Sequence, residues 1–258
     1  LEKICRKQVF PMLGKGVMRF ALKVPLLDVA IYGKIRQNLI DAFGGRVRTF
    51  IVGGAPLNGE VEDFLLKIGF PLTVGYGMTE CGPLISVTPD PAEFKARSCG
   101  MVLHPYMEVR IDSADQYNID GEIQTRGENV MVGYYKNEKA TKEMFTSDGW
   151  LRTGDVGTRD PDGTIYIRGR SKSMILGANG QNIYPEEIEA KLNNLYCVME
   201  SLIVEREGRL VALVYPDYEQ ADAEGLVNGK LEAVMNSNLD ELNTLVAPYE
   251  KVSGIVLY

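Results

Sequence analysis

Hydrophobic and polar positions along the first third of the chain predict a strand, a helix and a second strand. Apolar residues recur every four positions between residues 31 and 43 and two glycines follow, which is typical of an amphipathic helix that ends at glycine. Residues 47–52 predict a short buried strand, residues 59–68 a helix and residues 71–75 a second strand. Two strands joined by a helix at this spacing indicate a parallel α/β unit.

The pattern changes to short alternating strands at about residue 99. Apolar and polar side chains alternate over residues 107–111 and again over residues 121–126. The sequence Asp160-Pro161-Asp162-Gly163 predicts a hairpin turn that leads into another alternating run. The middle of the chain is therefore predicted to be rich in β-structure.

The last third has a pattern of its own. A helix is predicted to begin at Pro185, because two glutamates follow it in the first turn, where carboxylates suit the helix dipole. A hairpin is predicted around Glu207-Gly208, followed by a polar helical stretch over residues 221–245 and a strand over residues 254–257.

The composition of the 258-residue chain excludes several classes of protein. With 45% hydrophobic residues it can form a sizeable core, and no apolar run reaches the roughly 18 residues of a membrane-spanning helix. Four widely separated cysteines and one histidine provide neither a zinc site nor a disulfide framework, so we expect a reducing, cytoplasmic compartment. Because the sequence opens at Leu1 without methionine, we expect a piece of a longer protein.

The net charge of −7 is unevenly distributed. Residues 1–48 hold ten lysines and arginines against three acidic residues, a local charge of +7. Amphipathic helices that expose basic side chains to water account for this excess, and an anionic partner is the alternative. Aromatic residues are not interleaved with the basic ones, so nothing indicates a nucleic-acid partner.

Two loops at the ends of the predicted parallel strands could bind a ligand. Gly53-Gly54-Ala55-Pro56 would let the backbone lie against a planar group, although a tight turn needs the same glycines. Tyr76-Gly77-Met78-Thr79-Glu80 offers a ring for a base, a hydroxyl for a phosphate and a carboxylate for Mg²⁺. An ordinary polar loop explains these five residues equally well.

Three later positions are weaker candidates. Asp155 lies on a predicted turn and could accept hydrogen bonds from both hydroxyls of a ribose, but a turn aspartate is the commoner explanation. Arg170 would suit a phosphate or a ribose, or would simply be a solvated strand end. Residues 177–182, which include Gly180, form a glycine-bearing loop before a helix, a place that attracts anions, yet they match no phosphate-binding fingerprint.

Taken together, these segments resemble the adenylate-forming acyl-CoA synthetase superfamily. The resemblance extends over nearly the whole chain, and the sequence of residues 126–141 is most similar to the fatty acyl-CoA branch. The matching segments are, in order, GGAPL at 53–57, YGMTE at 76–80, GEI at 121–123 with GYY at 133–135, GWLRTGD at 149–155, GRSK at 169–172, and Gly180 with NIYPEEIE at 182–189.

The resemblance implies an α/β fold in three parts. Residues 1–98 would be the end of a large parallel α/β domain that binds AMP, and residues 99–171 its β-rich, distorted barrel-like subdomain. Residues 172–258 would be a small, hinged α+β domain that is truncated.

The resemblance also implies a two-step ligation with ATP, Mg²⁺ and CoA. A fatty acid carboxylate attacks the α-phosphate of ATP, and CoA then displaces AMP from the acyl-adenylate. The implied ATP or AMP contacts are the backbone of Gly54, Ala55 and Pro56, the loop of Tyr76, Gly77, Met78 and Thr79, and the ribose-binding pair Asp155 and Arg170. Thr79 would bind phosphate and Glu80 would hold Mg²⁺.

The small domain of the superfamily rotates between the two steps, and the implied hinge is Lys172, with Gly180 on the path of CoA. The superfamily's phosphate loop, rich in serine, threonine and glycine, and its lysine near the C-terminus have no counterpart in this sequence. We therefore expect the 258-residue chain to lack ligase activity by itself.

Other functions stay open at this point. An aryl-CoA ligase, an acyl-AMP ligase or a peptide-synthetase adenylation domain would carry similar segments, and a non-catalytic nucleotide-binding or scaffold protein is the alternative from another class. The sequence also leaves open whether a fatty substrate brings the protein to the inner membrane surface, since no amphipathic anchor stands out.

Overall fold

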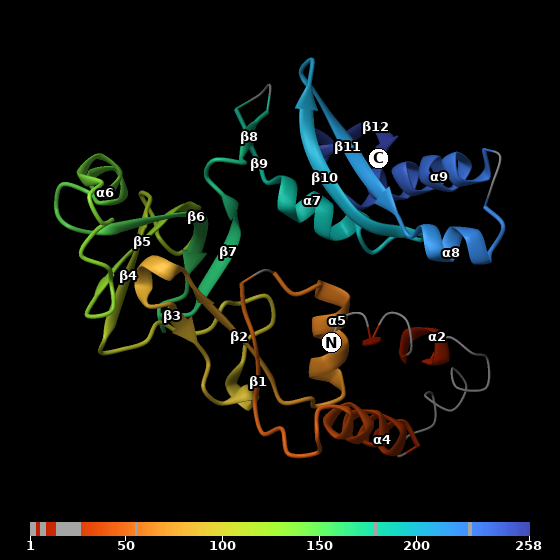
Figure 1. Cartoon of the computed structure of the whole chain (residues 1–258), viewed down its shortest axis with the longest axis horizontal. Coiled ribbons are helices and arrows are strands. Elements are labelled where there is room, and N and C mark those ends of the chain that lie inside the picture. The colour runs from red at the N-terminus through yellow and green to blue at the C-terminus, as the bar shows by residue number, and fades with distance from the viewer. Residues whose placement is uncertain (1–3, 6–8, 14–26, 55, 178–179, 227–228) are drawn as a thin grey trace. The chain divides into compact units, whose positions relative to one another are not determined.

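The structure is a computed structural model that describes every residue except 1–3, 6–8, 14–26, 55, 178–179 and 227–228 (Figure 1). Contacts divide the chain into two compact units. The first unit is Leu1–Thr153 with Thr158–Ile167, and the second is Gly154–Gly157 with Arg168–Tyr258. The three-part division expected from the sequence stays a prediction.

A parallel strand pair opens the first unit and confirms the predicted α/β arrangement. Strand β1 pairs with β2 in parallel, and β3 adds to β2 in antiparallel orientation. The expected buried strand over residues 47–52 is shorter than predicted, and Ile51 in it is 58% exposed, because one face of this edge strand is not covered. The elements are α2 (Phe10–Leu13), α4 (Leu27–Ala42), β1 (Phe50–Val52), α5 (Gly59–Lys67), β2 (Leu72–Gly77), the 3₁₀ turns η2 (Thr79–Cys81) and η3 (Pro91–Glu93), and β3 (Leu84–Val87).

Helix α5 connects the two parallel strands. Its first turn is capped by Asn58, whose side-chain oxygen accepts hydrogen bonds from the backbone N–H groups of Glu60 and Val61. Val61 and Leu65 are fully buried in a core that they share with α4. This packing fixes the direction in which β2 leaves the helix and therefore the place of the loop that follows β2.

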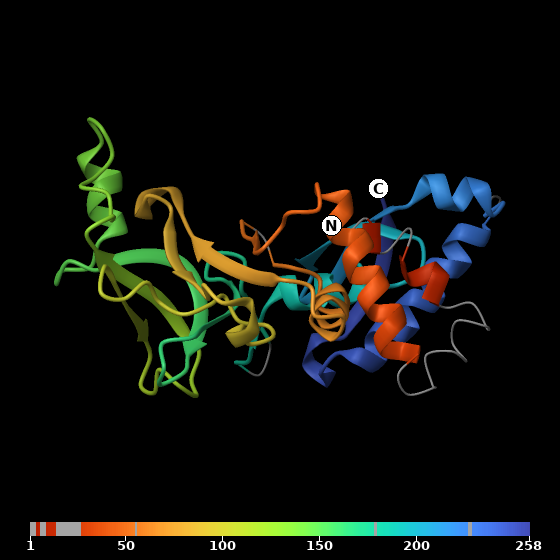
Figure 2. The same cartoon turned by 90° about the horizontal axis from the view of Figure 1, so that it is seen from below.

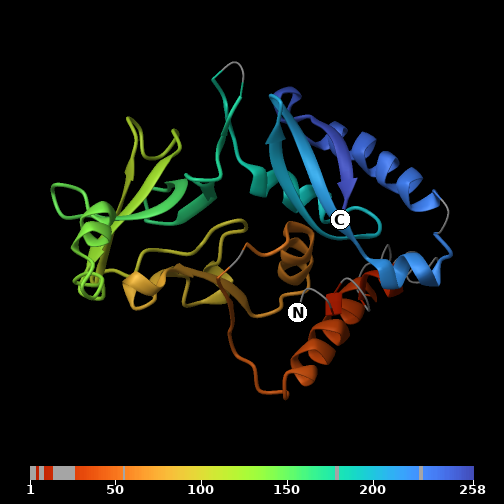
Figure 3. The same ribbon diagram turned by 45° about the horizontal axis from the view of Figure 1, so that its top comes forward.

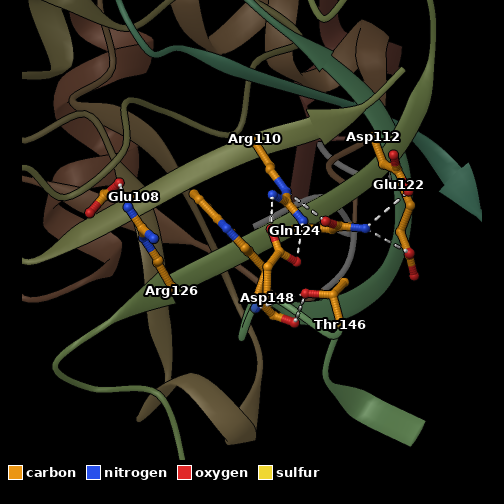
Figure 4. Close-up of polar contacts among 9 residues, drawn as sticks. Glu108, Arg110, Asp112, Glu122, Gln124, Arg126, Thr146 and Asp148 are labelled. Atoms are coloured by element: carbon orange, nitrogen blue, oxygen red, sulfur yellow. Dashed lines mark hydrogen bonds and ion pairs between the residues drawn. The ribbon is translucent and has the colours of Figure 1, made fainter. Parts of the chain in front are cut away.

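The β-rich part is a four-stranded sheet in the order β4-β5-β6-β7. One face of it is buried, and the other carries rows of paired polar side chains (Figure 4). Trp150 packs against two of these side chains, with the guanidinium carbons of Arg110 and Arg126 at 4.6 and 4.5 Å from the centre of its ring. The elements are β4 (Met107–Asp112), β5 (Gly121–Gly127), α6 (Glu138–Met144), β6 (Leu151–Arg159) and β7 (Ile165–Arg170), and Figure 2 shows α6 standing at the end of the sheet.

The second unit contains a short hairpin and a three-stranded sheet in the order β10-β11-β12 (Figure 3). The predicted hairpin is confirmed as β10 and β11, and the predicted last strand as β12. The single polar helical stretch expected over residues 221–245 is wrong, because two helices occupy this region. The elements are β8 (Ile175–Leu176), β9 (Asn182–Ile183), α7 (Pro185–Leu192), β10 (Val198–Arg206), β11 (Arg209–Pro216), α8 (Tyr218–Ala223), α9 (Lys230–Leu245), the 3₁₀ turn η4 (Pro248–Glu250) and β12 (Val252–Leu257).

The core of the second unit depends on side chains from α9. Leu242 is fully buried among residues of α7, β10 and β11, whereas Leu245 of the same helix is 51% exposed. We expect Leu242→Ala to lower the free energy of unfolding by about 2–5 kcal/mol, because it leaves a cavity, and Leu245→Ala to change it by less than about 1 kcal/mol. Chemical denaturation of both variants checks this, and equal effects would contradict the packing described.

No helix among the described residues is long and apolar enough to cross a membrane. None of the four cysteines, all of which lie in the described part of the chain, is in a disulfide.

Candidate functional site in two parts

The glycines after β1 are required by the backbone itself. A Cβ on Gly53 would lie 2.9 Å from the carbonyl oxygen of Gly75, and Gly54 has a φ of +85°, which other residues rarely adopt. Pro56 is exposed, and Ala55 lies outside the described residues. The tight-turn explanation therefore accounts for both glycines, and a role of Gly54, Ala55 and Pro56 in contacting a nucleotide stays a prediction.

The loop after β2 begins inside the core. Tyr76 is only 8% exposed and packs with Cys81 and Ile85, so most of its ring is occupied by protein. Burial raises the pKa of the Cys81 thiol to about 11, so this thiol is protonated at neutral pH. Gly77 has no room for a side chain, since a Cβ there would lie 1.9 Å from the carbonyl oxygen of Pro83. Met78 is half-buried, and its N–H donates to the same oxygen at 2.8 Å.

The hydroxyl and the carboxylate predicted to matter follow on the short turn η2. Thr79 is exposed, and Glu80 is half-buried. The hydroxyl of Tyr134 donates a hydrogen bond to Oε1 of Glu80 at 2.7 Å, and this bond raises the pKa of Tyr134. Tyr134 lies in the GYY segment at 133–135, and no role for it follows from the sequence; the glycine and the paired tyrosines are the signal that points to it.

Glu80 suits a metal ion that arrives with its own ligands. The described residues contain no group of three or more histidine, cysteine, aspartate or glutamate side chains able to hold a metal. Mg²⁺ is commonly bound by one or two carboxylates together with the phosphates of a nucleotide. A single carboxylate such as that of Glu80 fits magnesium delivered with ATP, and its role in holding magnesium stays a prediction.

The second unit holds the other two predicted binding residues, and the structure brings them together. Nε of Arg170 lies 3.0 Å from Oδ1 of Asp155, although the two are fifteen positions apart. Asp155 is 7% exposed and Arg170 projects into solvent. The N–H of Ser171 donates to the carbonyl oxygen of Gly154 at 2.8 Å and keeps the two segments adjacent. A carboxylate held in this way can accept hydrogen bonds from hydroxyl groups.

Lys172 and Gly180 lie elsewhere in the second unit. Lys172 is exposed in the turn that follows Arg170. Gly180 has a φ of +82° and lies where the β8–β9 hairpin turns, closed by a hydrogen bond from the N–H of Gly177 to the carbonyl oxygen of Gln181 at 2.8 Å. Helix α7 begins at Pro185, close after this loop as predicted, with the two-residue strand β9 between them. The hinge and CoA roles of Lys172 and Gly180 stay predictions.

Known proteins that are similar to this chain include AMP-binding enzymes and acyl-CoA synthetases. The family of AMP-binding enzymes matches residues 15–135. Long chain acyl-CoA synthetase 6, peroxisomal, of Arabidopsis thaliana is 36% identical over 232 residues, which cover 83% of this chain and 32% of that protein. Residues 15–135 of this chain are thus similar to AMP-binding enzymes. Its resemblance to adenylate-forming enzymes is thereby confirmed.

Two further members show how far the similarity extends. Long-chain-fatty-acid–CoA ligase 1 of Homo sapiens is 32% identical over 272 residues, covering 95% of this chain and 37% of that protein. The crystal structure of ATP-bound MatB from Rhodopseudomonas palustris has a TM-score of 0.67 and 26% identity, covering 89% of this chain and 46% of that one. The chain spans about a third of the length of the curated relatives that it matches.

Proposed function

We propose that the protein containing this chain is an ATP-dependent long-chain fatty acid–CoA ligase. The observation that carries the proposal is the 36% identity to a long chain acyl-CoA synthetase over 83% of the chain. The Asp155–Arg170 pair supports it, because the resemblance assigns both residues to the ribose and the structure has them 3.0 Å apart.

The proposed reaction has two steps. A carboxylate oxygen of the fatty acid attacks the α-phosphorus of ATP, and the bond from that phosphorus to pyrophosphate breaks. The thiol sulfur of CoA then attacks the acyl carbon, AMP leaves with the electron pair of the acyl–oxygen bond, and the thiol proton passes to solvent. Magnesium bound to ATP neutralises phosphate charge in the first step.

Each predicted binding residue has a proposed role. The Asp155 carboxylate accepts hydrogen bonds from the ribose hydroxyls, and Arg170 orients that carboxylate and adds a donor. The Thr79 hydroxyl donates to a phosphate, and Glu80 contributes one oxygen to magnesium. Tyr76, Gly77, Met78 and the turn of Gly54, Ala55 and Pro56 form the adenine-binding surface. Tyr76 is only 8% exposed in this structure, so little of its ring is accessible to a base.

Residues of the second unit are proposed to serve the thioester-forming step. Lys172 lies in an exposed turn, where a hinge between domains could act, and the hairpin turn at Gly180 leaves the backbone open to the pantetheine arm of CoA. We also propose a cytoplasmic location with peripheral contact to the inner membrane surface, since a fatty substrate partitions into lipid. Cosedimentation with lipid vesicles tests this last proposal.

An ATP–pyrophosphate exchange assay, run on the protein that carries this sequence with and without palmitate, tests the function. Palmitate-dependent exchange, followed by AMP and acyl-CoA when CoA is added, is the expected result. Exchange without thioester formation would favour an acyl-AMP ligase or a peptide-synthetase adenylation domain, and exchange only with aromatic acids would favour an aryl-CoA ligase. Binding of AMP without any exchange would favour a non-catalytic nucleotide-binding protein. For the 258-residue chain alone we expect AMP binding and no exchange.

A further inference from the structure

A second segment of the first unit holds the turn that carries Glu80. The N–H of Met131 donates to the carbonyl oxygen of Glu80 at 2.7 Å. Nδ2 of Asn129 donates to the carbonyl oxygen of Leu84 at 2.9 Å, and also to that of Cys81. The backbone around Glu80 is thus tied to residues about fifty positions later in the chain.

Tyr134 extends this connection from the backbone to the side chain of Glu80. Its hydroxyl donates to Oε1 of Glu80 at 2.7 Å, a distance typical of an O–H bond to a carboxylate. A hydrogen bond to an ionised acceptor is stronger than one between neutral groups, so it restricts the rotamers available to the carboxylate.

The position of Tyr134 is itself fixed by the first turn of α6. Its backbone N–H donates to the hydroxyl oxygen of Thr141 at 2.9 Å, and that hydroxyl donates to the carbonyl oxygen of Asn137 at 2.9 Å. At Gly133 a Cβ would lie 2.8 Å from the Thr141 side chain. The phenol is therefore directed at Glu80 by a rigid support rather than by a flexible loop.

We infer that Tyr134 is a positioning residue, whose hydroxyl holds the Glu80 carboxylate in the orientation that binds the magnesium of Mg–ATP. This inference rests on the proposed function, since it assumes that Glu80 meets magnesium. Loss of the group that orients a ligating carboxylate commonly weakens metal binding about 10- to 100-fold. The hydrogen bond also reduces the negative charge on the carboxylate, which slightly weakens its attraction for the metal. This loss is smaller than the gain from holding the side chain in place, because ordering a free glutamate side chain on metal binding would cost conformational entropy.

The neighbouring residue provides a matched control. Tyr135 is 88% exposed, and its ring lies under the ammonium group of Lys136 at 5.2 Å rather than against Glu80. Tyr134→Phe and Tyr135→Phe remove the same atom from adjacent tyrosines. Only the first variant removes a hydrogen bond to Glu80.

The experiment compares binding of Mn–ATP, followed by the electron paramagnetic resonance of manganese, with binding of metal-free AMP. We expect Tyr134→Phe to weaken Mn–ATP binding at least tenfold, to leave AMP binding within twofold and to leave the melting temperature nearly unchanged. Tyr135→Phe should match the unchanged protein in all three. In a Glu80→Gln background, Tyr134→Phe should have no further effect, because the two residues act as a unit.

The outcomes separate the inference from the function on which it rests. Unchanged Mn–ATP binding by Tyr134→Phe, in a chain that binds Mn–ATP, overturns the positioning role and leaves the proposed function standing. Equal weakening of Mn–ATP and AMP also overturns it, because it marks a general structural effect. Failure of the unchanged protein that carries this sequence to bind either nucleotide overturns the proposed function together with the inference.

Discussion

Asp155→Asn is expected to weaken AMP binding by about 10- to 100-fold, because hydrogen bonds to a charged acceptor are worth roughly 1.5–3 kcal/mol. The substitution keeps the volume of the side chain and removes the charge that Arg170 faces at 3.0 Å. Isothermal titration calorimetry with AMP, 2′-deoxy-AMP and 3′-deoxy-AMP measures the effect. The unchanged protein should bind AMP more tightly than the two deoxy analogues, and the variant should bind all three alike.

Asp148→Asn is the matched control for this substitution. Asp148 also pairs with an arginine, with Oδ2 lying 2.6 Å from Nη1 of Arg110, but it lies on the polar face of the sheet and has no proposed ligand role (Figure 4). We expect AMP binding to stay within twofold of the unchanged protein. If Asp155→Asn kept the preference for AMP over its deoxy analogues, the assignment of Asp155 to the ribose would be wrong.

Gly77→Ala is expected to destabilise the first unit by about 3 kcal/mol or more, the upper part of the range for overpacking. A Cβ at this position would lie 1.9 Å from the carbonyl oxygen of Pro83 and 2.9 Å from the Cα of Leu84. These are backbone atoms, so the strand pair itself must move apart. The same shift would break the 2.8 Å bond from the N–H of Met78 to that oxygen and would displace the Thr79–Glu80 turn. Thermal unfolding and AMP titration measure the two effects.

Gly33→Ala gives the comparison. Gly33 is a glycine of helix α4 with no atom within 4 Å of where a Cβ would lie. Alanine is favoured over glycine in a helix interior by about 1 kcal/mol, so this variant should be slightly more stable than the unchanged protein. Similar destabilisation by both variants would mean that the close approach at Gly77 does not decide the stability of the loop.

The sequence was informative wherever a repeating pattern had one physical cause. The parallel pair β1–β2 and the hairpin β10–β11 were predicted, because buried strands and turn residues leave a short-range signature. The division of residues 221–245 between two helices was not, since a polar segment has no strong periodicity to mark where one helix ends.

The candidate site shows the same limit. The proximity of Asp155 and Arg170 followed from a resemblance and agrees with the structure. The bond from Tyr134 to Glu80 could not be predicted, because it joins residues 54 positions apart through contacts that only the folded chain creates. The burial of Tyr76 could not be predicted either, since an aromatic residue at the end of a strand occurs both in cores and on binding surfaces.

The contact of Trp150 with Arg110 and Arg126 gives this protein a built-in optical reporter. Trp150 is the only tryptophan of the chain, and it lies in the first unit. Trp150 is 8% exposed and both guanidinium groups lie close to its ring, so the wavelength and intensity of its emission will change when that sheet opens. Tryptophan fluorescence, excited at wavelengths that tyrosine does not absorb, therefore follows the first unit alone, whereas far-ultraviolet circular dichroism follows both. Two melting curves that fail to superimpose would reveal, without any label, that the units unfold independently.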